Sequence, residues 1–206
     1  MEYVSNLMFW ISNGLLIPVI VGLLFFFIKS VFMLGGLFNK YQQRNKQSAV
    51  LKKIPDLNRE NVAEWKSVLS TVPPTKFTAT CSQLFNQKAS EAHRVRQIAE
   101  FEIESDREIG KSKTLTKFGP VLGLMGTLIP MGPALVGLST GDIGSMAYNM
   151  QVAFATTVLG LFAGAVGFIL VQTQQRWLMT DLTNLDFISD LLSQSQNKAT
   201  WLSDEE

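Results

Sequence analysis

Two apolar runs without formal charge, residues 118–139 and 146–172, most constrain how this chain can fold. Each run has about 20 residues or slightly more, and at ~1.5 Å per helical residue this length crosses a ~30 Å hydrocarbon layer. The short polar segment 140–145 between them has room only for a turn. The two runs therefore predict an antiparallel hairpin of two membrane-spanning helices.

Small residues recur in both runs at intervals of four and three, an interval that places them on one side of each helix. Because lipid provides little hydrophobic drive between helices, small residues allow the close backbone approach that holds them together. We expect both runs to pack tightly against other helices. The predicted packing residues are Gly119, Gly123, Gly126, Pro130 and Pro133 in the first run, and Ala153, Gly160, Gly164 and Gly167 in the second.

A third apolar run, residues 14–37, follows a short N-terminal segment, 1–13. The basic region of a signal peptide is missing before this run and a small-residue cleavage site does not follow it, so we interpret the run as a permanent span. The bulky band Phe25–Ile28 predicts a helix that faces lipid. Lys29 is expected to extend its side chain to the inner interface.

Basic residues define the predicted orientation. Apart from Lys29, Arg176 and Lys198, every lysine and arginine lies between Lys40 and Lys117. The positive-inside rule then places residues 38–117 in the cytoplasm. The N-terminus and the 140–145 turn are expected outside, and the 173–206 tail inside. The predicted fold class is an all-α membrane protein with three spans and long cytoplasmic helical extensions.

The segment 38–117 reads as helical. Asn58 is a candidate cap for a short helix that carries Val62, Trp65 and Leu69 and ends before two prolines. From about Thr75 a long helix is predicted to continue into the second span, with Gly110 as its weak point. Its apolar stripe is predicted at Ala92, Val95, Ala99 and Ile103.

The tail after the third span predicts an amphipathic helix packed on the protein's own helices. Its apolar residues recur at helical spacing, and Asp181 is expected to lie away from them. The members of this stripe are Leu178, Leu182, Leu185, Ile188 and Leu192.

Composition narrows the possible functions. The chain is 47% hydrophobic and 17% charged with a formal net charge of +1, which indicates a membrane protein without a nucleic-acid partner. The single cysteine, Cys81, excludes an internal disulfide, and its separation from His93 matches no metal-ligand spacing. We expect neither a catalytic constellation nor a cofactor or metal, so the chain is not predicted to be an enzyme.

The polar side chains inside the two C-terminal runs are Thr127, Gln151, Thr156 and Thr157. A threonine in a membrane helix often donates only to a carbonyl of its own helix. A proton carrier, in contrast, normally needs an ionisable group at membrane depth, and the three runs contain no Asp, Glu or His there. The chain alone is therefore not expected to form a self-sufficient channel.

Two segments resemble the signature of the MotA/TolQ/ExbB proton-channel family, and three spans fit its TolQ/ExbB branch. The segments are Gly123-Leu124-Met125-Gly126-Thr127 and Thr157-Val158-Leu159-Gly160-Leu161. The resemblance implies an ion-driven molecular motor in a prokaryotic inner membrane. It implies a ring, usually a homopentamer, around a single-span ExbD/TolR/MotB-like partner. The partner's membrane Asp would carry H⁺ or Na⁺, and the ring's threonines would line the path.

Within that resemblance, Thr127 and Thr157 are the first candidates for the ion pathway, followed by Thr156 and Gln151. Counting from the cytoplasmic ends of the two spans predicts that Thr127 and Thr157 differ in depth by ~8 Å. Thr156 is rotated ~100° from Thr157 and is expected off the small-residue stripe. The alternative is a structural membrane scaffold, in which the small-residue faces serve packing alone and no ion is conducted.

Overall fold

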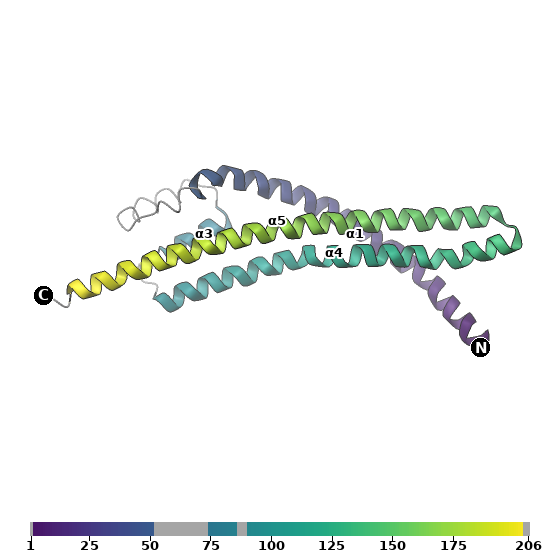
Figure 1. The fold of residues 1–206 in the computed structure, drawn as a ribbon, viewed down its shortest axis with the longest axis horizontal. Helices are drawn as coiled ribbons and strands as arrows, with labels where there is room; N and C mark the ends of the chain where they lie inside the picture. Colours follow the sequence, from purple (N-terminus) through teal and green to yellow (C-terminus); the bar gives the residue numbers. More distant parts are fainter. Residues whose placement is uncertain (1, 52–73, 86–89, 204–206) are drawn as a thin grey trace. The chain divides into compact units, whose positions relative to one another are not determined.

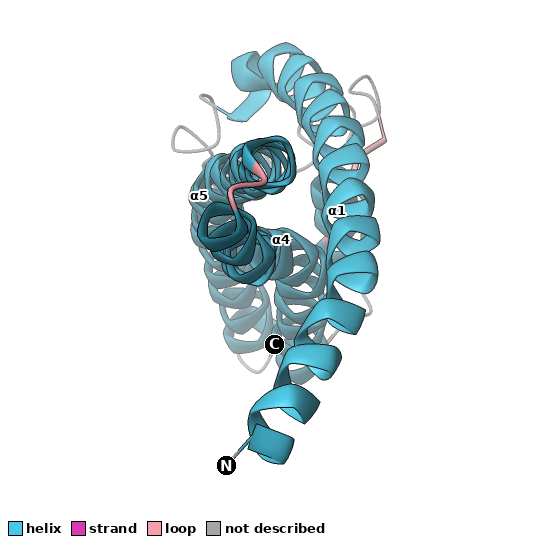
Figure 2. Cartoon of the chain, turned by 90° about the vertical axis from the view of Figure 1, so that its right-hand side faces the viewer, coloured by secondary structure: helices cyan, strands magenta, loops and turns pink. Residues whose placement is uncertain are grey.

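The computed structural model of the protein describes residues 2–51, 74–85 and 90–203. Its helices are α1 (Glu2–Leu51), α3 (Lys76–Leu84), α4 (Glu91–Thr140) and α5 (Ile143–Ser203) (Figure 1). Within these ranges the regular structure is entirely helical (Figure 2). Helices α1, α4 and α5 are each long and apolar enough to cross a membrane, which confirms the all-helical class and the three spans. The short helix predicted after Asn58, with Val62, Trp65 and Leu69, lies outside the described residues.

The chain divides into two compact units. The apolar unit comprises Met1–Gly36 and Gly110–Gln172, and the polar unit comprises Leu37–Ile109 and Thr173–Glu206. Each unit has its own buried residues, and each is described separately below.

In the apolar unit, α4 and α5 are joined by a turn of two residues, shorter than the expected 140–145 (Figure 1). Gly141 adopts a φ of 75°, a left-handed conformation that a glycine adopts without strain. The amide of Asp142 donates to the Gly137 carbonyl at 2.8 Å, the long hydrogen bond of a Schellman C-cap. The Asp142 carboxylate then accepts from the Ser145 amide at 3.0 Å and caps α5. Gly141 and Asp142 therefore end α4 and start α5.

Helices α4 and α5 meet through their glycines. A β-carbon added to Gly160 would lie 2.6 Å from the Gly119 carbonyl oxygen and 2.7 Å from the Gly123 α-carbon. One added to Gly126 would lie 2.6 Å from the Thr156 β-carbon. A real β-carbon could not lie this close to its neighbours. The two backbones can therefore approach each other only because glycine has no side chain at these positions. The small-residue faces of the two spans pack against each other within one chain.

Three prolines lie inside α4 without ending the helix or separating it from α5. Pro120, Pro130 and Pro133 lie inside α4, which continues to Thr140. Pro130 is fully buried and Pro133 is half-buried, whereas the next residue, Ala134, is buried. Ala153 is buried on α5. Gly164 meets the Pro120 ring, and Gly167 meets the Thr116 amide.

The first span packs on the α4–α5 hairpin through part of its aromatic band. The Phe26 ring stacks on Phe118 with centroids 6.4 Å apart, and the Phe27 ring meets Phe162 at 5.4 Å. Phe25 and Ile28 remain exposed, at 61% and 53%. The band is therefore divided between the hairpin and the outer surface, because successive helical residues point ~100° apart.

In the polar unit, the buried side of α4 is not the predicted stripe. Ala92, Val95, Ala99 and Ile103 are all exposed. The buried residues of this segment are Arg94, Ile98, Phe101 and Ile109. Arg94 donates to the Ser193 hydroxyl of α5 at 2.8 Å, and Phe101 and Ile109 line a pocket with residues of α3 and α5. The segment therefore carries two apolar stripes, one buried within the unit and the predicted one exposed.

The helix predicted to run continuously from Thr75 is divided. Thr75 caps α3 by a capping box with Thr78, and α3 ends at Leu84 with Phe85 as its C-cap. Helix α4 starts at Glu91, where the Ser90 carbonyl accepts hydrogen bonds from the amides of His93 and Arg94. Gly110, expected as a weak point, lies inside an uninterrupted helix. Separate caps at Thr75 and Ser90 explain why this segment forms two helices.

The tail continues α5, and its buried side includes an acidic residue. Leu178, Leu185 and Ile188 are buried as predicted, but Asp181 is buried among them. The expectation that Asp181 lies away from the stripe is wrong, since it lies three residues after Leu178 and four before Leu185. A cation from α1, described below, compensates its charge.

The glycine contacts generate a stability prediction. Gly160→Ala places a methyl group against backbone atoms of α4, and overpacking of this kind costs roughly 1–3 kcal/mol. We expect a lower melting temperature for this variant in detergent, followed by circular dichroism. Gly14→Ala is the matched control, because nothing lies within 4 Å of an added β-carbon in the same unit. Equal melting temperatures for the two variants would contradict the tight hairpin.

Candidate functional site: the membrane threonines and a charged pocket

The hairpin register brings the candidate threonines to one level. Gly126 lies opposite Thr156, while Gly123 lies opposite Gly160. Thr127 and Thr157 follow Gly126 and Thr156 directly, and on antiparallel helices these two steps run in opposite directions. The Gly126–Thr156 contact therefore offsets the two threonines by two residues and the Gly123–Gly160 contact by one, which is ~1.5–3 Å. The offset of ~8 Å predicted by counting from the span ends is therefore too large, because the spans do not begin and end at common levels.

Helical rotation places Thr127 and Thr157 on the same flank of the hairpin. Each is rotated ~100° from a residue that faces the other helix. On antiparallel helices the same sense of rotation leads to the same side of the pair. Residues that contact α1 are rotated in the opposite sense. Leu122, which meets Gly22, is rotated ~40° from Gly126, and Phe162, which meets Phe27, is rotated ~120° from Thr156. The two threonines therefore share the flank that α1 does not cover.

Thr156 occupies the helix interface itself. It is 5% exposed, and its side chain fills the space that Gly126 leaves open. The expectation that Thr156 lies off the small-residue stripe is wrong, because the packed side of α5 runs through positions 153, 156, 160 and 163. Thr156 is thus the packing residue, whereas Thr157 is half-buried beside it.

All three threonine hydroxyls donate to carbonyls of their own helix. Thr127 donates to the Leu124 carbonyl at 2.7 Å, Thr157 to Ala153 at 3.0 Å, and Thr156 to Ala153 at 2.9 Å. Each hydroxyl oxygen retains lone pairs that can accept a hydrogen bond. A hydroxyl in this state can also rotate to donate to an anion that approaches its open side.

Gln151 does not join this group. Its side chain is exposed, and it lies six residues before Thr157, ~240° around α5. Two further hydroxyls are buried that were not predicted from the sequence. Ser30, which donates to the Phe27 carbonyl at 2.7 Å, and Ser112 are fully buried in the apolar unit. Their burial follows from packing, and their spacing offered no signal.

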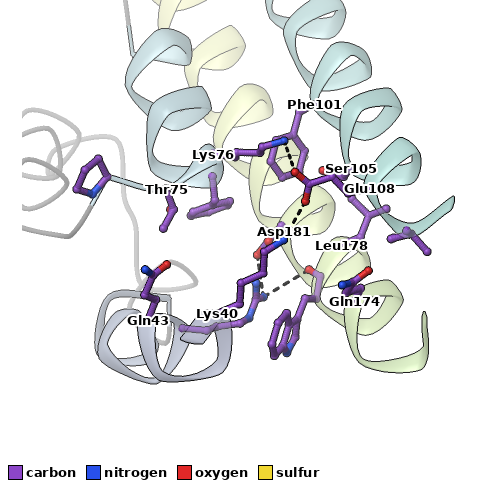
Figure 3. Close-up of a pocket in the computed structure, with 15 residues that line it drawn as sticks. Lys40, Gln43, Thr75, Lys76, Phe101, Ser105, Glu108, Gln174, Leu178 and Asp181 are labelled. Atoms are coloured by element: carbon purple, nitrogen blue, oxygen red, sulfur yellow. Dashed lines mark hydrogen bonds and ion pairs between the residues drawn. The ribbon is translucent and has the colours of Figure 1, made fainter. Parts of the chain in front are cut away.

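The polar unit contains a pocket of about 280 Å³ that α1, α3, α4 and α5 line (Figure 3). Glu108 accepts from Lys40 at 2.9 Å and from Lys76 at 2.8 Å, so one carboxylate joins α1, α3 and α4. Lys76 also contacts Glu104 at 2.7 Å. The Glu104 side chain remains 65% exposed in this pair.

Glu108 has a strongly shifted pKa. Burial opposes its ionisation, but hydrogen bonds and charge from Lys76 and Lys40 outweigh burial and lower the pKa of the carboxyl to about 2. For Lys76, burial likewise opposes the charged form, and its two carboxylate partners raise its pKa. Glu108 and Lys76 are therefore both charged at neutral pH.

Arg44 and Asp181 form the second charged contact of the pocket. The two guanidinium nitrogens of Arg44 lie 2.9 and 2.8 Å from the carboxylate oxygens, a bidentate pair. The guanidinium also lies 5.3 Å from the centre of the Trp177 ring. Burial raises the pKa of Asp181, although Arg44 opposes this shift. The sequence signal was available, since Asp181 stands at a core position of the tail stripe and requires a cation.

The structure shows no sign of metal or thiol chemistry in its described part. Among those residues, no group of three or more His, Cys, Asp and Glu side chains could hold a metal ion. Cys81 is fully buried, and burial, with the nearby charge of Asp181, raises the pKa of its thiol to about 12. His93 is exposed and pairs with the Ser90 hydroxyl at 3.0 Å.

Comparison with known proteins agrees with the resemblance. Residues 70–185 match the model of the MotA/TolQ/ExbB proton channel family. The match covers more than half of the chain, so this protein belongs to that family, and it is a multi-pass membrane protein. Searches of curated proteins and of solved structures give no significant match.

The pKa of Glu108 predicts a pH dependence. A carboxyl whose pKa is lowered from 4.5 to about 2 stabilises the folded state above pH 4.5, and this contribution is lost as the pH falls toward 2. Because Glu108 is 38% exposed, solvent screening reduces the contribution to about 1 kcal/mol. We expect Glu108→Gln to be less stable at pH 7 and to show a shallower loss between pH 5 and 3.

Unfolding of the purified protein in urea measures both effects. Asp186→Asn is the control, because Asp186 is exposed in the same unit. If Glu108→Gln and wild type lose stability in parallel between pH 5 and 3, the lysine contacts do not stabilise the folded state.

Proposed function

We propose that this chain is a ring subunit of a membrane motor driven by the ion-motive force. In this proposal, several copies surround a single-span ExbD/TolR/MotB-like partner, and Thr127 and Thr157 line the ion path between ring and partner. The ion is H⁺ or Na⁺, and its flow powers work across the cell envelope. Membership of a proton channel family supports the ion-conducting role.

The observation that carries the proposal is the shared position of Thr127 and Thr157. They lie one to two residues apart in level, on the flank that α1 leaves uncovered. Apolar side chains such as Leu124 and Leu161 are exposed nearby. A carboxylate buried in such surroundings requires hydrogen-bond donors or a proton. Two hydroxyls at one level would stabilise the charged form while the ion is absent.

The need for a partner follows from the composition of the spans. The three apolar runs contain no acidic or imidazole side chain, so a second protein has to contribute the group that binds and releases the ion. A membrane Asp on a single-span partner meets this requirement. Thr156, buried between α4 and α5, serves packing, and Gln151 lies away from the proposed path.

The proposed location is the cytoplasmic membrane of a prokaryote, with the N-terminus outside and the C-terminus inside. The concentration of lysine and arginine between Lys40 and Lys117 supports this orientation. A phosphatase that is active only outside the cytoplasm should therefore remain inactive when fused after Glu206. An active fusion at this site would overturn the topology.

Thr127→Val and Thr157→Val test the pathway, because valine keeps the shape and removes the hydroxyl. A hydrogen bond to a charged group contributes about 1.5–3 kcal/mol, so we expect each variant to lose about tenfold or more of the ion-driven activity. The measurement is complementation of a strain that lacks the gene, and assembly is followed by native mass spectrometry. Both variants should assemble normally.

Thr180→Val is the matched control, since Thr180 is exposed in the polar unit and its hydroxyl also donates to its own helix, at 3.0 Å. Full activity of both membrane variants would favour the structural scaffold, in which the hydroxyls serve only their own helices. The back-bonded hydroxyls are the observation that keeps this second function in consideration.

A further inference from the structure

We propose that the exposed side of α4 between Glu91 and Arg107 is a self-association seam, where α4 helices of neighbouring copies pack side by side in parallel. Glu91 and Glu102 of one copy face Arg96 and Arg107 of the next copy. The proposal rests on the ring assembly proposed above, and it assigns the surface that holds neighbouring copies together in the polar unit.

The first observation is an apolar stripe that the chain itself does not cover. Val95 and Ile103 are 59% and 69% exposed, and Ala92 and Ala99 are exposed on the same side of α4. The opposite side of the helix, with Ile98 and Phe101, forms the core of the unit. An exposed apolar strip bordered by charges is typical of a protein interface.

The second observation is the sign of the charges along the two edges of the stripe. Taking Ala99 as the centre and ~100° per residue, Glu91 and Glu102 fall on one edge, and Arg96 and Arg107 fall on the other. All four side chains are exposed. Glutamates thus stand on one edge and arginines on the other. Asp106 lies at the end of the stripe itself, and Glu100, which pairs with Arg96, lies beyond the arginine edge.

The third observation is the spacing between the two edges. Arg96 follows Glu91 by five residues, and Arg107 follows Glu102 by five residues. In parallel helices that pack side by side, an edge residue of one helix faces the residue on the other edge of the neighbouring helix that lies five positions later in the sequence. The spacing thus fits a parallel neighbour. The two charge pairs repeat after eleven residues, as Ala92 and Ile103 of the stripe do, whereas Asp106 stands eleven residues after Val95.

A second copy satisfies this surface better than other occupants. Copies inserted in one membrane share their orientation, so their helices are parallel. Complementary edges produce a head-to-tail contact that closes into a ring. An anionic lipid surface would be attracted to the arginines but repelled by an equal number of glutamates. The Arg96–Glu100 contact within the helix, 2.9 Å long, is exposed and contributes little, so Arg96 can exchange partners.

Charge reversal tests the seam in the full-length protein in its native membrane. Glu102→Arg and Arg107→Glu each place like charges across the contact, and we expect each to reduce the cross-linked oligomer about tenfold. The double variant Glu102→Arg/Arg107→Glu restores opposite charges, so the oligomer should return to near the wild-type amount. Thr183→Lys, an exposed change on α5, is the control and should leave the oligomer unchanged.

A second measurement tests the proximity directly. The double variant Glu102→Cys/Arg107→Cys should give a ladder of oligomers with a short bis-maleimide, while each single variant should give a much weaker ladder. Cys81 is fully buried and should stay unmodified, so its protection also reports that each variant is folded.

The seam is wrong if the charge-swapped double variant forms even less oligomer than either single variant. It is also wrong if the cross-links join the seam to another protein instead of a second copy. If wild type is an oligomer and seam variants leave it intact, the seam is wrong and the ring proposal stands. If wild type itself is monomeric in the membrane, the ring proposal and the seam both fail.

Discussion

The close approach of α4 and α5 over their glycines is the contact on which the apolar unit depends. A β-carbon at Gly160 or Gly119 would collide with backbone atoms of the opposite helix, at 2.6 and 2.8 Å. In a membrane, dispersion between closely spaced backbones replaces the hydrophobic effect as the source of helix association. The same contact sets the register of the hairpin, and the register brings Thr127 and Thr157 to one level.

Because the small-residue faces are buried within one chain, they are no longer free to join copies of the chain. The sequence pattern suggested only that both spans pack tightly, and it left the partner of each face open. With this contact internal, association of copies has to use the surfaces that remain exposed. The seam of α4 is one such surface, and it combines an apolar strip with edges of opposite charge.

In the polar unit, ion pairs join α1 to the other helices. Glu108 of α4 contacts Lys40 of α1 and Lys76 of α3, and these side chains remain partly exposed. The pair of Arg44 in α1 and Asp181 in α5 is largely buried. Removing one partner of a buried pair is costly because the other charge is left without compensation, so this contact fixes α1 beside α5.

The sequence by itself determined the three spans, the hairpin and the family, since these follow from local length, periodicity and motif. It also identified Thr127 and Thr157, because the motif names them. Tertiary structure decided the rest. Two apolar stripes compete on α4, and only packing against α3 and α5 selects Ile98 and Phe101 over Val95 and Ile103. The depth of the threonines and the burial of Thr156 and Asp181 depend on register and on partners from distant segments, which local patterns do not encode.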